Sequence, residues 1–310
     1  MNQAPNPTMR AAEWVLLLIL SLLWGGSFFF AKIAVGELPP LLVVLLRVAI
    51  AAIILLAVLR LTGLSSPRDG RSWRNLFIMG LLNNAIPFAL FFWAQTHIPS
   101  GLAAILNGTT PLFGVIVAQL VGQERMTVAR VIGVLLGIVG VAVMIGPALL
   151  AGLGSDAIAE IACLCAALSY AFAGVFGRHY LRALQPMVTA TGQLIATTVV
   201  MVPVVALTVP GLGALHPSLT VIGAMIGLAV LSTALAYVLY FRILAAAGST
   251  NLLLVTQVMP ITTILLSWGF LGEHLQARHL AGMAIIALGF AATDGRVFQR
   301  LKRPAPSLGR

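Results

Sequence analysis

Long apolar runs alternate with short polar breaks along nearly the whole chain. A helix needs roughly 20 mostly apolar residues to cross a bilayer, and ten runs are about this long. They cover residues 13–35, 40–61, 74–96, 100–120, 127–147, 157–179, 186–208, 218–244, 248–270 and 277–296. The breaks are rich in proline, glycine and serine, which favour turns. The pattern predicts an all-α membrane protein with ten transmembrane helices.

One stretch, residues 100–146, is repeated at residues 249–295 with an offset of 149 positions. Each copy is an apolar run with a proline near its middle, a polar break with a glutamate, and a second apolar run. The aligned pairs include Ser100 with Ser249, Pro111 with Pro260, and Glu124 with Glu273. Each half then holds five helices, an odd number, so the halves must enter the membrane from opposite sides. We therefore expect two inverted five-helix repeats, residues 1–150 and residues 151–310, the second with a cytoplasmic C-terminal tail.

Composition supports a membrane protein and gives no support to metal or nucleotide chemistry. Apolar residues make up 60% of the chain and charged residues only 8%, whereas soluble domains carry about 25% charged residues. The two cysteines, Cys163 and Cys165, would point about 200° apart on a helix and cannot bridge each other. The sequence has no His-Glu-x-x-His motif, no Cys-x-x-Cys pair and no glycine-rich phosphate loop. We therefore expect no cofactor and no metal.

Basic residues are distributed unevenly between the two sides of the predicted bundle. The side with both termini and the loops after the second, fourth, sixth and eighth runs carries fifteen lysines and arginines, and the other side only Lys32 and Arg278. Cytoplasmic loops are enriched in basic residues. The distribution therefore predicts a multi-pass protein of the bacterial inner membrane with both termini in the cytoplasm. It also explains the net charge of +10 without a nucleic-acid partner.

Three motifs carry a resemblance to a known family. They are Leu23-Trp24-Gly25-Gly26-Ser27 followed by Lys32, then Leu46-Arg47-Val48-Ala49, and the proline with a closing glutamate in the fourth and ninth runs. Together they resemble the EamA family of the drug/metabolite transporter superfamily, over about residues 13–296. The resemblance implies ten helices in two inverted repeats, a central cavity, and export of small metabolites such as amino acids, with the aromatic amino-acid exporters of the YddG type nearest. One departure is Gln123, where the family has glycine before the glutamate.

Pro111 and Pro260 lie near the middle of the fourth and ninth runs. A proline cannot donate a backbone hydrogen bond and so frees a carbonyl one turn earlier. Such a carbonyl is tolerated in a membrane only against protein or a water-filled cavity. A simple packing kink is the alternative. Because both copies have the proline at an equivalent depth, we expect both to act as gating hinges beside a cavity.

Polar and aromatic side chains occur at the middle depth of several runs. Amides and hydroxyls there need partners, which are either neighbouring helices or a substrate. Aromatic rings either fill the core or stack on an apolar substrate. The resulting candidates for substrate binding are Trp24, Asn83, Asn84, Asn107, Tyr170, Ser232, Tyr237 and Gln257.

Arg47 is the one ionisable residue well inside a run, about seven residues or roughly 10 Å from its end. Ionisable residues at such depth are functional by default, so Arg47 is a candidate to bind a substrate carboxylate. Alternatively its long side chain reaches outward to the membrane surface or bonds helix-end carbonyls.

Two other groups of residues are expected to be structural. Glycines spaced along the fifth and tenth runs, which include Gly133, Gly137, Gly282 and Gly289, are typical of closely packed membrane helices. Glu124 and Glu273 stand at loop edges, where hydrogen bonds to helix ends and loops are expected rather than catalysis.

The remaining titratable groups bear on how transport would be driven. Carboxylates and histidines lie at or near the ends of the runs, and Glu13 and Glu160 come nearest to an exception. Proton-driven antiporters keep such a group inside the membrane. We therefore expect an exporter of small amphipathic metabolites, amino acids and aromatic ones in particular, working by alternating access and facilitated transport without proton coupling. A multidrug or nucleobase exporter driven by proton antiport is the alternative.

Two other classes of membrane protein have less support. A membrane enzyme would need a constellation of catalytic side chains, and none is visible in the sequence. A non-transporting scaffold would have no need for prolines at matching depths in its two halves. The expected partners are a small-molecule substrate and the lipid bilayer. We expect a monomer, with a dimer as the alternative.

Overall fold

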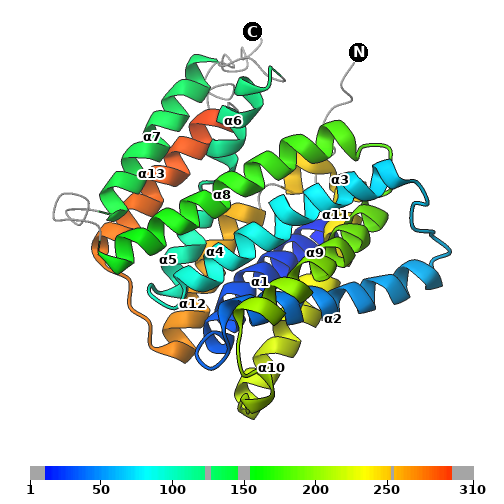
Figure 1. The fold of residues 1–310 in the computed structure, drawn as a ribbon. Coiled ribbons are helices and arrows are strands. Elements are labelled where there is room, and N and C mark those ends of the chain that lie inside the picture. Colours follow the sequence, from blue (N-terminus) through cyan, green and yellow to red (C-terminus); the bar gives the residue numbers. More distant parts are fainter. Residues whose placement is uncertain (1–10, 123–126, 146–153, 253–254, 295–310) are drawn as a thin grey trace, which may run out of the picture.

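The computed structural model describes residues 11–122, 127–145, 154–252 and 255–294, and every regular element in these ranges is a helix (Figure 1). The first half contains α1 (Ala11–Ala34), α2 (Pro40–Leu61), α3 (Gly70–Gly80), η1 (Leu81–Ala85), α4 (Ile86–Ala94), α5 (Ser100–Asn107), α6 (Thr110–Leu120) and α7 (Val128–Ile145). The second half contains α8 (Ser155–Tyr180), α9 (Pro186–Thr208), η3 (Leu212–Ala214), α10 (Leu219–Ile226), η4 (Gly227–Leu235), α11 (Ala236–Leu252), α12 (Val255–Leu271) and α13 (Ala277–Asp294).

Within the described ranges, 8 helical stretches are long and apolar enough to cross a membrane. They are Ala11–Ala34, Pro40–Leu61, Gly70–Ala94, Ser100–Leu120, Val128–Ile145, Ser155–Tyr180, Pro186–Thr208 and Leu219–Ile243. Two shorter apolar helices, Val258–Leu271 and Ala277–Ala292, follow them. The prediction of an all-helical multi-pass membrane protein is confirmed in this form, and ten spans stay a prediction.

The contacts between helices are related by the internal repeat: helices of one half pack against helices of the other, and the main contacts have counterparts. α2 packs against α9, and α7 packs against α13, so each of these pairs joins helices at equivalent positions. α1 packs against α11 and α12, just as α8 packs against α4 and against α5 and α6. The two halves are therefore interleaved rather than separate, and any space at their interface is lined by both.

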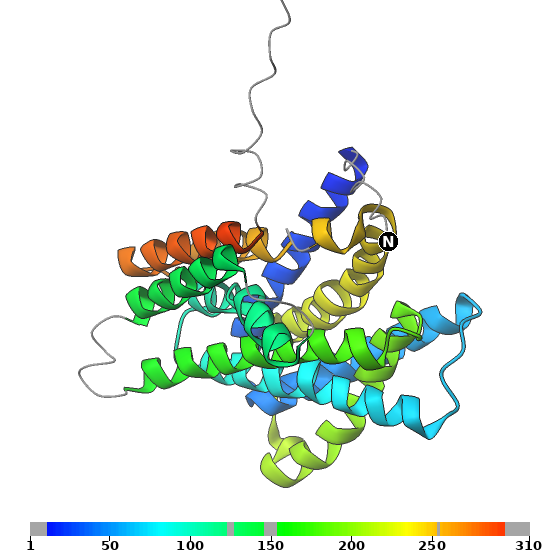
Figure 2. The same ribbon diagram turned by 90° about the horizontal axis from the view of Figure 1, so that it is seen from above.

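α7 and α13 lie side by side in both views (Figures 1 and 2). A Cβ atom built on Gly282 would lie 2.6 Å from the carbonyl oxygen of Gly140, and one built on Gly289 would lie 2.6 Å from that of Gly133. Atoms cannot approach so closely, so only glycine allows these two backbones their present distance. The prediction of close helix packing at the glycine repeat is confirmed.

The two mid-run prolines differ in their effect on the helix. α5 ends at Asn107 and α6 begins at Thr110, so Pro111 occupies the first turn of a new helix, where its missing N–H is not needed. Pro260 lies inside α12, which continues through it from Val255 to Leu271. The two prolines therefore do not interrupt their helices alike: α5 ends before Pro111, whereas α12 continues through Pro260.

A matched irregularity does exist, one helix earlier in each half. The five residues of the π-helical segment η1, moved by 149 positions, fall on residues 230–234, inside the π-helical segment η4. A π-helical turn inserts an extra residue into a helix and is frequent at functional sites. The two segments carry Asn83 and Asn84 in one half and Ser232 and Thr233 in the other.

Candidate functional site: a cavity between the two halves

A cavity of about 530 Å³ lies between the halves, within the range of roughly 300–1,000 Å³ usual for small-molecule sites. Residues of both halves line it. They come from α1 (Trp24, Ser27, Phe28), α2 (Arg47), α3 and η1 (Met79, Asn83), α4 (Phe88, Phe91, Phe92), α5 and α6 (Asn107, Thr110), α8 and the turn after it (Tyr170, Gly174, Gly177, Leu181, Arg182, Leu184), α9 (Pro186, Thr189, Ala190, Gln193), η4 and α11 (Ser232, Thr233, Tyr237, Tyr240, Phe241) and α12 (Thr256, Met259).

Most residues singled out in the sequence meet in this cavity. Those that line it are Trp24, Arg47, Asn83, Asn107, Tyr170, Ser232 and Tyr237. Asn84, Pro111 and Pro260 are not among the lining residues. Gln257 belongs to α12, but its side chain lies outside the described residues. Residues chosen for their depth therefore meet in one cavity, the rotation of each helix decides which faces line it, and their binding of a substrate stays a prediction.

Arg47 is buried, with 6% of its surface exposed, and does not reach outward to the membrane surface. Its Nε donates a hydrogen bond of 3.0 Å to Thr233 Oγ1 on η4. The guanidinium carbon lies 3.8 Å from the centre of the Phe88 ring, a cation–π contact. The side chain is thus held in place from both halves, with its charge at the cavity wall.

A chain of neutral hydrogen bonds crosses another part of the wall. Asn83 Nδ2 donates to Gln193 Oε1 at 3.2 Å, and Gln193 Nε2 donates to the Tyr237 hydroxyl at 3.2 Å. The chain therefore joins η1, α9 and α11. Ser232 Oγ is buried at the cavity and has no hydrogen-bond partner among the described residues. Because a buried hydroxyl favours a partner, Ser232 is a group that a substrate can satisfy.

Asn84 joins helices instead of lining the cavity. Its Nδ2 donates to Thr197 Oγ1 of α9 at 3.2 Å, and that hydroxyl lies 3.1 Å from the Gly80 carbonyl oxygen, to which it can donate. A Cβ atom built on Gly80 would come within 2.8 Å of the Gln193 carbonyl oxygen, so the two backbones are close here. Asn84 is better explained by contact between α9 and η1 than by substrate binding.

Aromatic rings form much of the remaining wall. Trp24 of α1 packs against Tyr240, with ring centres 5.6 Å apart. Tyr170 of α8 lies parallel to Phe91 at 6.1 Å, and Phe91 meets Phe28 edge-on at 5.4 Å. Moving Trp24 by 146 positions gives Tyr170, so the halves supply matching aromatics. Such rings can stack on an apolar substrate body.

Both mid-run prolines stand one turn after a residue that lines the cavity. Four residues before Pro111 is Asn107, and four before Pro260 is Thr256, and both line the cavity. The Asn107 carbonyl accepts a hydrogen bond from Thr110 Oγ1 at 2.7 Å. The two proline rings therefore lie next to the cavity lining without belonging to it.

The charges of the lining are of one sign. Within the part of the chain that the structure describes, the lining residues include Arg47 and Arg182 but no aspartate or glutamate. Glu160 is buried within α8 and does not line the cavity, and its Oε2 has no hydrogen-bond partner among the described residues. The cavity thus favours a substrate with a negative group over a cation.

The mouth of the cavity lies at the turn between α8 and α9. Leu181, Arg182 and Leu184 of this turn belong to the lining, and Arg182 is exposed. The opposite end is closed by Phe28, which packs against Phe91 near the far ends of α1 and α4. The lining thus reaches the surface at the turn between α8 and α9, which we call the open end, and consists of buried rings at Phe28 and Phe91, which we call the closed end.

Several lining residues were missed in the sequence. Gln193 was detectable as a polar residue in the middle of an apolar run. Phe91, Phe92 and Met79 had no such signal, because apolar residues fill every face of these helices. Thr233 follows Ser232 at the middle depth of its run, and in the structure it anchors Arg47.

Comparison with known proteins agrees with this architecture. The model of the EamA-like transporter family matches residues 12–146 and again residues 157–293. Protein PecM of Dickeya dadantii is 28% identical over 91% of this chain and 93% of its own length. The uncharacterized inner membrane transporter YedA of Escherichia coli K12 is 29% identical over 87% of this chain and 86% of its own. A solved crystal structure aligns over 95% of this chain and 100% of its own with a TM-score of 0.66 at 22% identity, which shows a shared fold.

Proposed function

The chain belongs to the EamA-like transporter family, and we propose that it exports small amphipathic metabolites across the bacterial inner membrane. The proposed substrates carry a carboxylate and an apolar body, as amino acids do, the aromatic ones in particular. The relative YedA is named as an inner membrane transporter, which supports the choice of membrane. Transport proceeds by alternating access, with each end of the cavity opening in turn.

The observation that carries the proposal is the cavity lining: one oriented guanidinium, neutral hydrogen-bonding groups and aromatic rings, with no carboxylate among the described lining residues. Arg47 binds the substrate carboxylate, and Trp24, Tyr170 and Tyr237 pack around the apolar body. The substrate ammonium lies against ring faces and amide oxygens. A dication would meet repulsion from Arg47 without a compensating carboxylate.

The open mouth fits the direction of export. The turn between α8 and α9 belongs to the side rich in lysine and arginine, which is proposed to be cytoplasmic, together with both termini. A cavity open to the cytoplasm is the state in which an exporter takes up its substrate. Because the described lining residues include no carboxylate or histidine that could carry a proton, we propose facilitated transport down the substrate gradient.

Flux of labelled phenylalanine through liposomes that contain the purified protein tests this proposal. We expect saturable flux, unchanged by an imposed pH gradient, that is lost in Arg47→Gln. Phenethylamine, which lacks the carboxylate, is the matched control compound and is expected to cross no faster than in empty liposomes. Flux of phenethylamine equal to that of phenylalanine would contradict the role of Arg47.

One observation favours the alternative of proton antiport. Glu160 is buried in α8 with an unpartnered oxygen within the described part of the chain, and interior carboxylates often carry protons in transporters. Strong stimulation of flux by a proton gradient, abolished in Glu160→Gln, would establish antiport in place of facilitated transport.

A further inference from the structure

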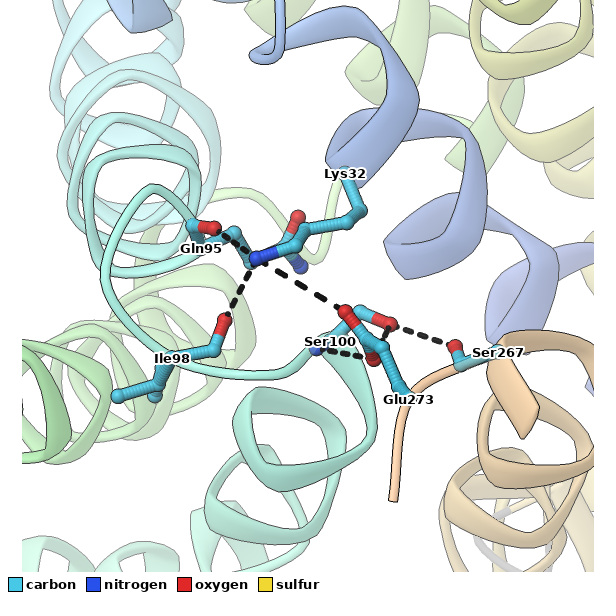
Figure 3. Close-up of polar contacts among 6 residues, drawn as sticks. All are labelled: Lys32, Gln95, Ile98, Ser100, Ser267 and Glu273. Carbon is cyan, nitrogen blue, oxygen red and sulfur yellow. Dashed lines mark hydrogen bonds and ion pairs between the residues drawn. The ribbon is translucent and has the colours of Figure 1, made fainter. Parts of the chain in front are cut away.

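At the closed end of the cavity, Lys32 and Glu273 face each other where the ends of four helices meet (Figure 3). Lys32 stands one turn beyond Phe28 on α1, and Gln95 stands one turn beyond Phe92 after α4. A turn is about 5.4 Å long, so this group of residues lies just outside the aromatic floor of the cavity. We call Lys32, Gln95, Ile98, Ser100, Ser267 and Glu273 the latch.

Glu273 joins the second half of the chain to the first. Its Oε2 accepts hydrogen bonds from the backbone N–H and the hydroxyl of Ser100, both at 2.8 Å. Its Oε1 lies 3.8 Å from Lys32 Nζ and makes no hydrogen bond to a described residue. The Ser100 hydroxyl also lies 2.5 Å from that of Ser267 on α12. The start of α5 is thereby fastened to the end of α12.

Lys32 fastens α1 to the loop between α4 and α5. Its Nζ donates to the carbonyl oxygens of Gln95 at 2.6 Å and Ile98 at 3.0 Å. These carbonyls follow a helix end, where backbone acceptors lack helical partners. With Glu273 on its other side, the ammonium connects three segments that would have to separate for this end of the cavity to open.

At the open end, the equivalent of Lys32 makes no such contact with described residues, and Glu124, the equivalent of Glu273, lies outside the described residues. Moving Lys32 by 146 positions gives Arg178, which is exposed and makes no hydrogen bond or ion pair with described residues. The same shift takes Phe28 to Gly174, which lines the cavity near its mouth without a side chain. Among the described residues, the two ends therefore differ at the positions of Lys32 and Phe28.

We propose that the latch is the gate of the closed end and that its contacts break once in every transport cycle. The inference rests on the proposed alternating-access function. The Lys32–Glu273 contact is partly exposed, at 29% and 12% of the two side chains, so water can replace the lost hydrogen bonds when the gate opens. A fully buried ion pair would resist such opening.

The first test measures opening of the gate without any substrate. A cysteine at Gln95, whose side chain is fully buried, reports opening through its reaction with a hydrophilic maleimide, in full-length protein with Cys163→Ala and Cys165→Ala. We expect Lys32→Gln and Glu273→Gln each to raise the labelling rate about tenfold, which corresponds to about 1.4 kcal/mol. Asp69→Asn is the matched control, because Asp69 accepts a hydrogen bond from Ser72 N within its own segment and joins no second segment. Equal labelling rates in all four proteins would overturn the proposal.

The second test closes the gate covalently. The Ser100 and Ser267 hydroxyls are close enough for a disulfide in Ser100→Cys/Ser267→Cys. Oxidation is expected to stop substrate flux, and a reductant to restore it. Full flux through the oxidised, cross-linked protein would overturn the proposal. If Gln95→Cys is labelled at the expected rates but no amino acid is transported, the result would support the latch and count against the proposed substrates. Failure of the latch proposal and failure of the proposed function are therefore distinguishable.

Discussion

Arg47 of the first half and Thr233 of the second are joined by a hydrogen bond of 3.0 Å from Nε to Oγ1 at the wall of the cavity. Thr233 in turn donates to the carbonyl oxygen of Leu228, five residues earlier, at 2.7 Å. The π-helical turn of η4 creates this arrangement, because an extra residue per turn brings the hydroxyl over that carbonyl. The same irregularity therefore orients Arg47, the one buried charged residue among the described lining residues.

Replacing Arg47 by lysine is expected to weaken substrate affinity by about tenfold or more. Lysine keeps the positive charge but loses the planar fork, so it cannot both bond Thr233 and present two N–H groups to a carboxylate. The measurement is the Michaelis constant for phenylalanine flux in liposomes. Thr233→Val, which removes only the anchor, should give a smaller loss. An unchanged Michaelis constant in Arg47→Lys would mean that Arg47 is structural.

Asn83 and Asn84 are adjacent in sequence but are expected to respond differently to mutation. Asn84→Ala removes a helix-to-helix hydrogen bond to Thr197 and should lower stability by about 0.6 kcal/mol, the average for such bonds in membrane proteins. Its effect on the substrate's Michaelis constant should be small. Asn83→Ala should raise that constant, since it removes a lining amide and frees Gln193. Thermal unfolding and flux of both variants check this, and interchanged effects would refute the assignment.

Much of the fold and of the candidate site could be expected from the sequence, and part of them could not. The length of apolar runs fixed where helices lie, because the bilayer allows few alternatives. The depth of Asn83, Ser232 and Tyr237 placed them near a cavity. Their partners depend on how each helix is rotated about its axis, which helices with apolar residues on every face leave open. The π-helical segments had no signal in composition, although η1 carries both Asn83, which lines the cavity, and Asn84, which does not.

The glycines between α7 and α13 permit a precise test of packing. Gly289→Leu would place a side chain where the Gly133 carbonyl oxygen lies 2.6 Å from the Cβ position. Overpacking of this kind usually costs about 1–3 kcal/mol. Gly269→Leu is the control, because a Cβ there meets no atom within 4 Å. We expect a lower unfolding temperature for Gly289→Leu alone, and equal unfolding temperatures would contradict the close contact.

Glu37 makes a second set of hydrogen bonds at the closed end, and its contribution to stability should depend on pH. The backbone N–H and the hydroxyl of Ser218 donate to this exposed carboxylate at 2.7 Å each, and the backbone bond is the larger cause of a pKa below the usual 4.5. The folded protein therefore binds this proton less readily than the unfolded chain. The stabilisation is complete above about pH 4.5 and is lost as the pH falls through the lowered pKa. Unfolding temperatures of wild type and Glu37→Gln should differ at pH 6 and converge in acid, and a constant difference would count against the contact.

Pro260 should matter for the rate of transport although α12 is not broken at this residue. Its ring has no backbone N–H to donate within α12. From Pro260 to its end at Leu271, α12 runs toward the latch. Pro260→Ala supplies the missing N–H donor and should make α12 less able to bend, so flux should slow several-fold while the unfolding temperature holds or rises. Pro203→Ala is the matched control, because Pro203 is also inside a helix but is exposed on α9, away from the cavity. Equal flux in both variants would leave Pro260 with a role in packing only.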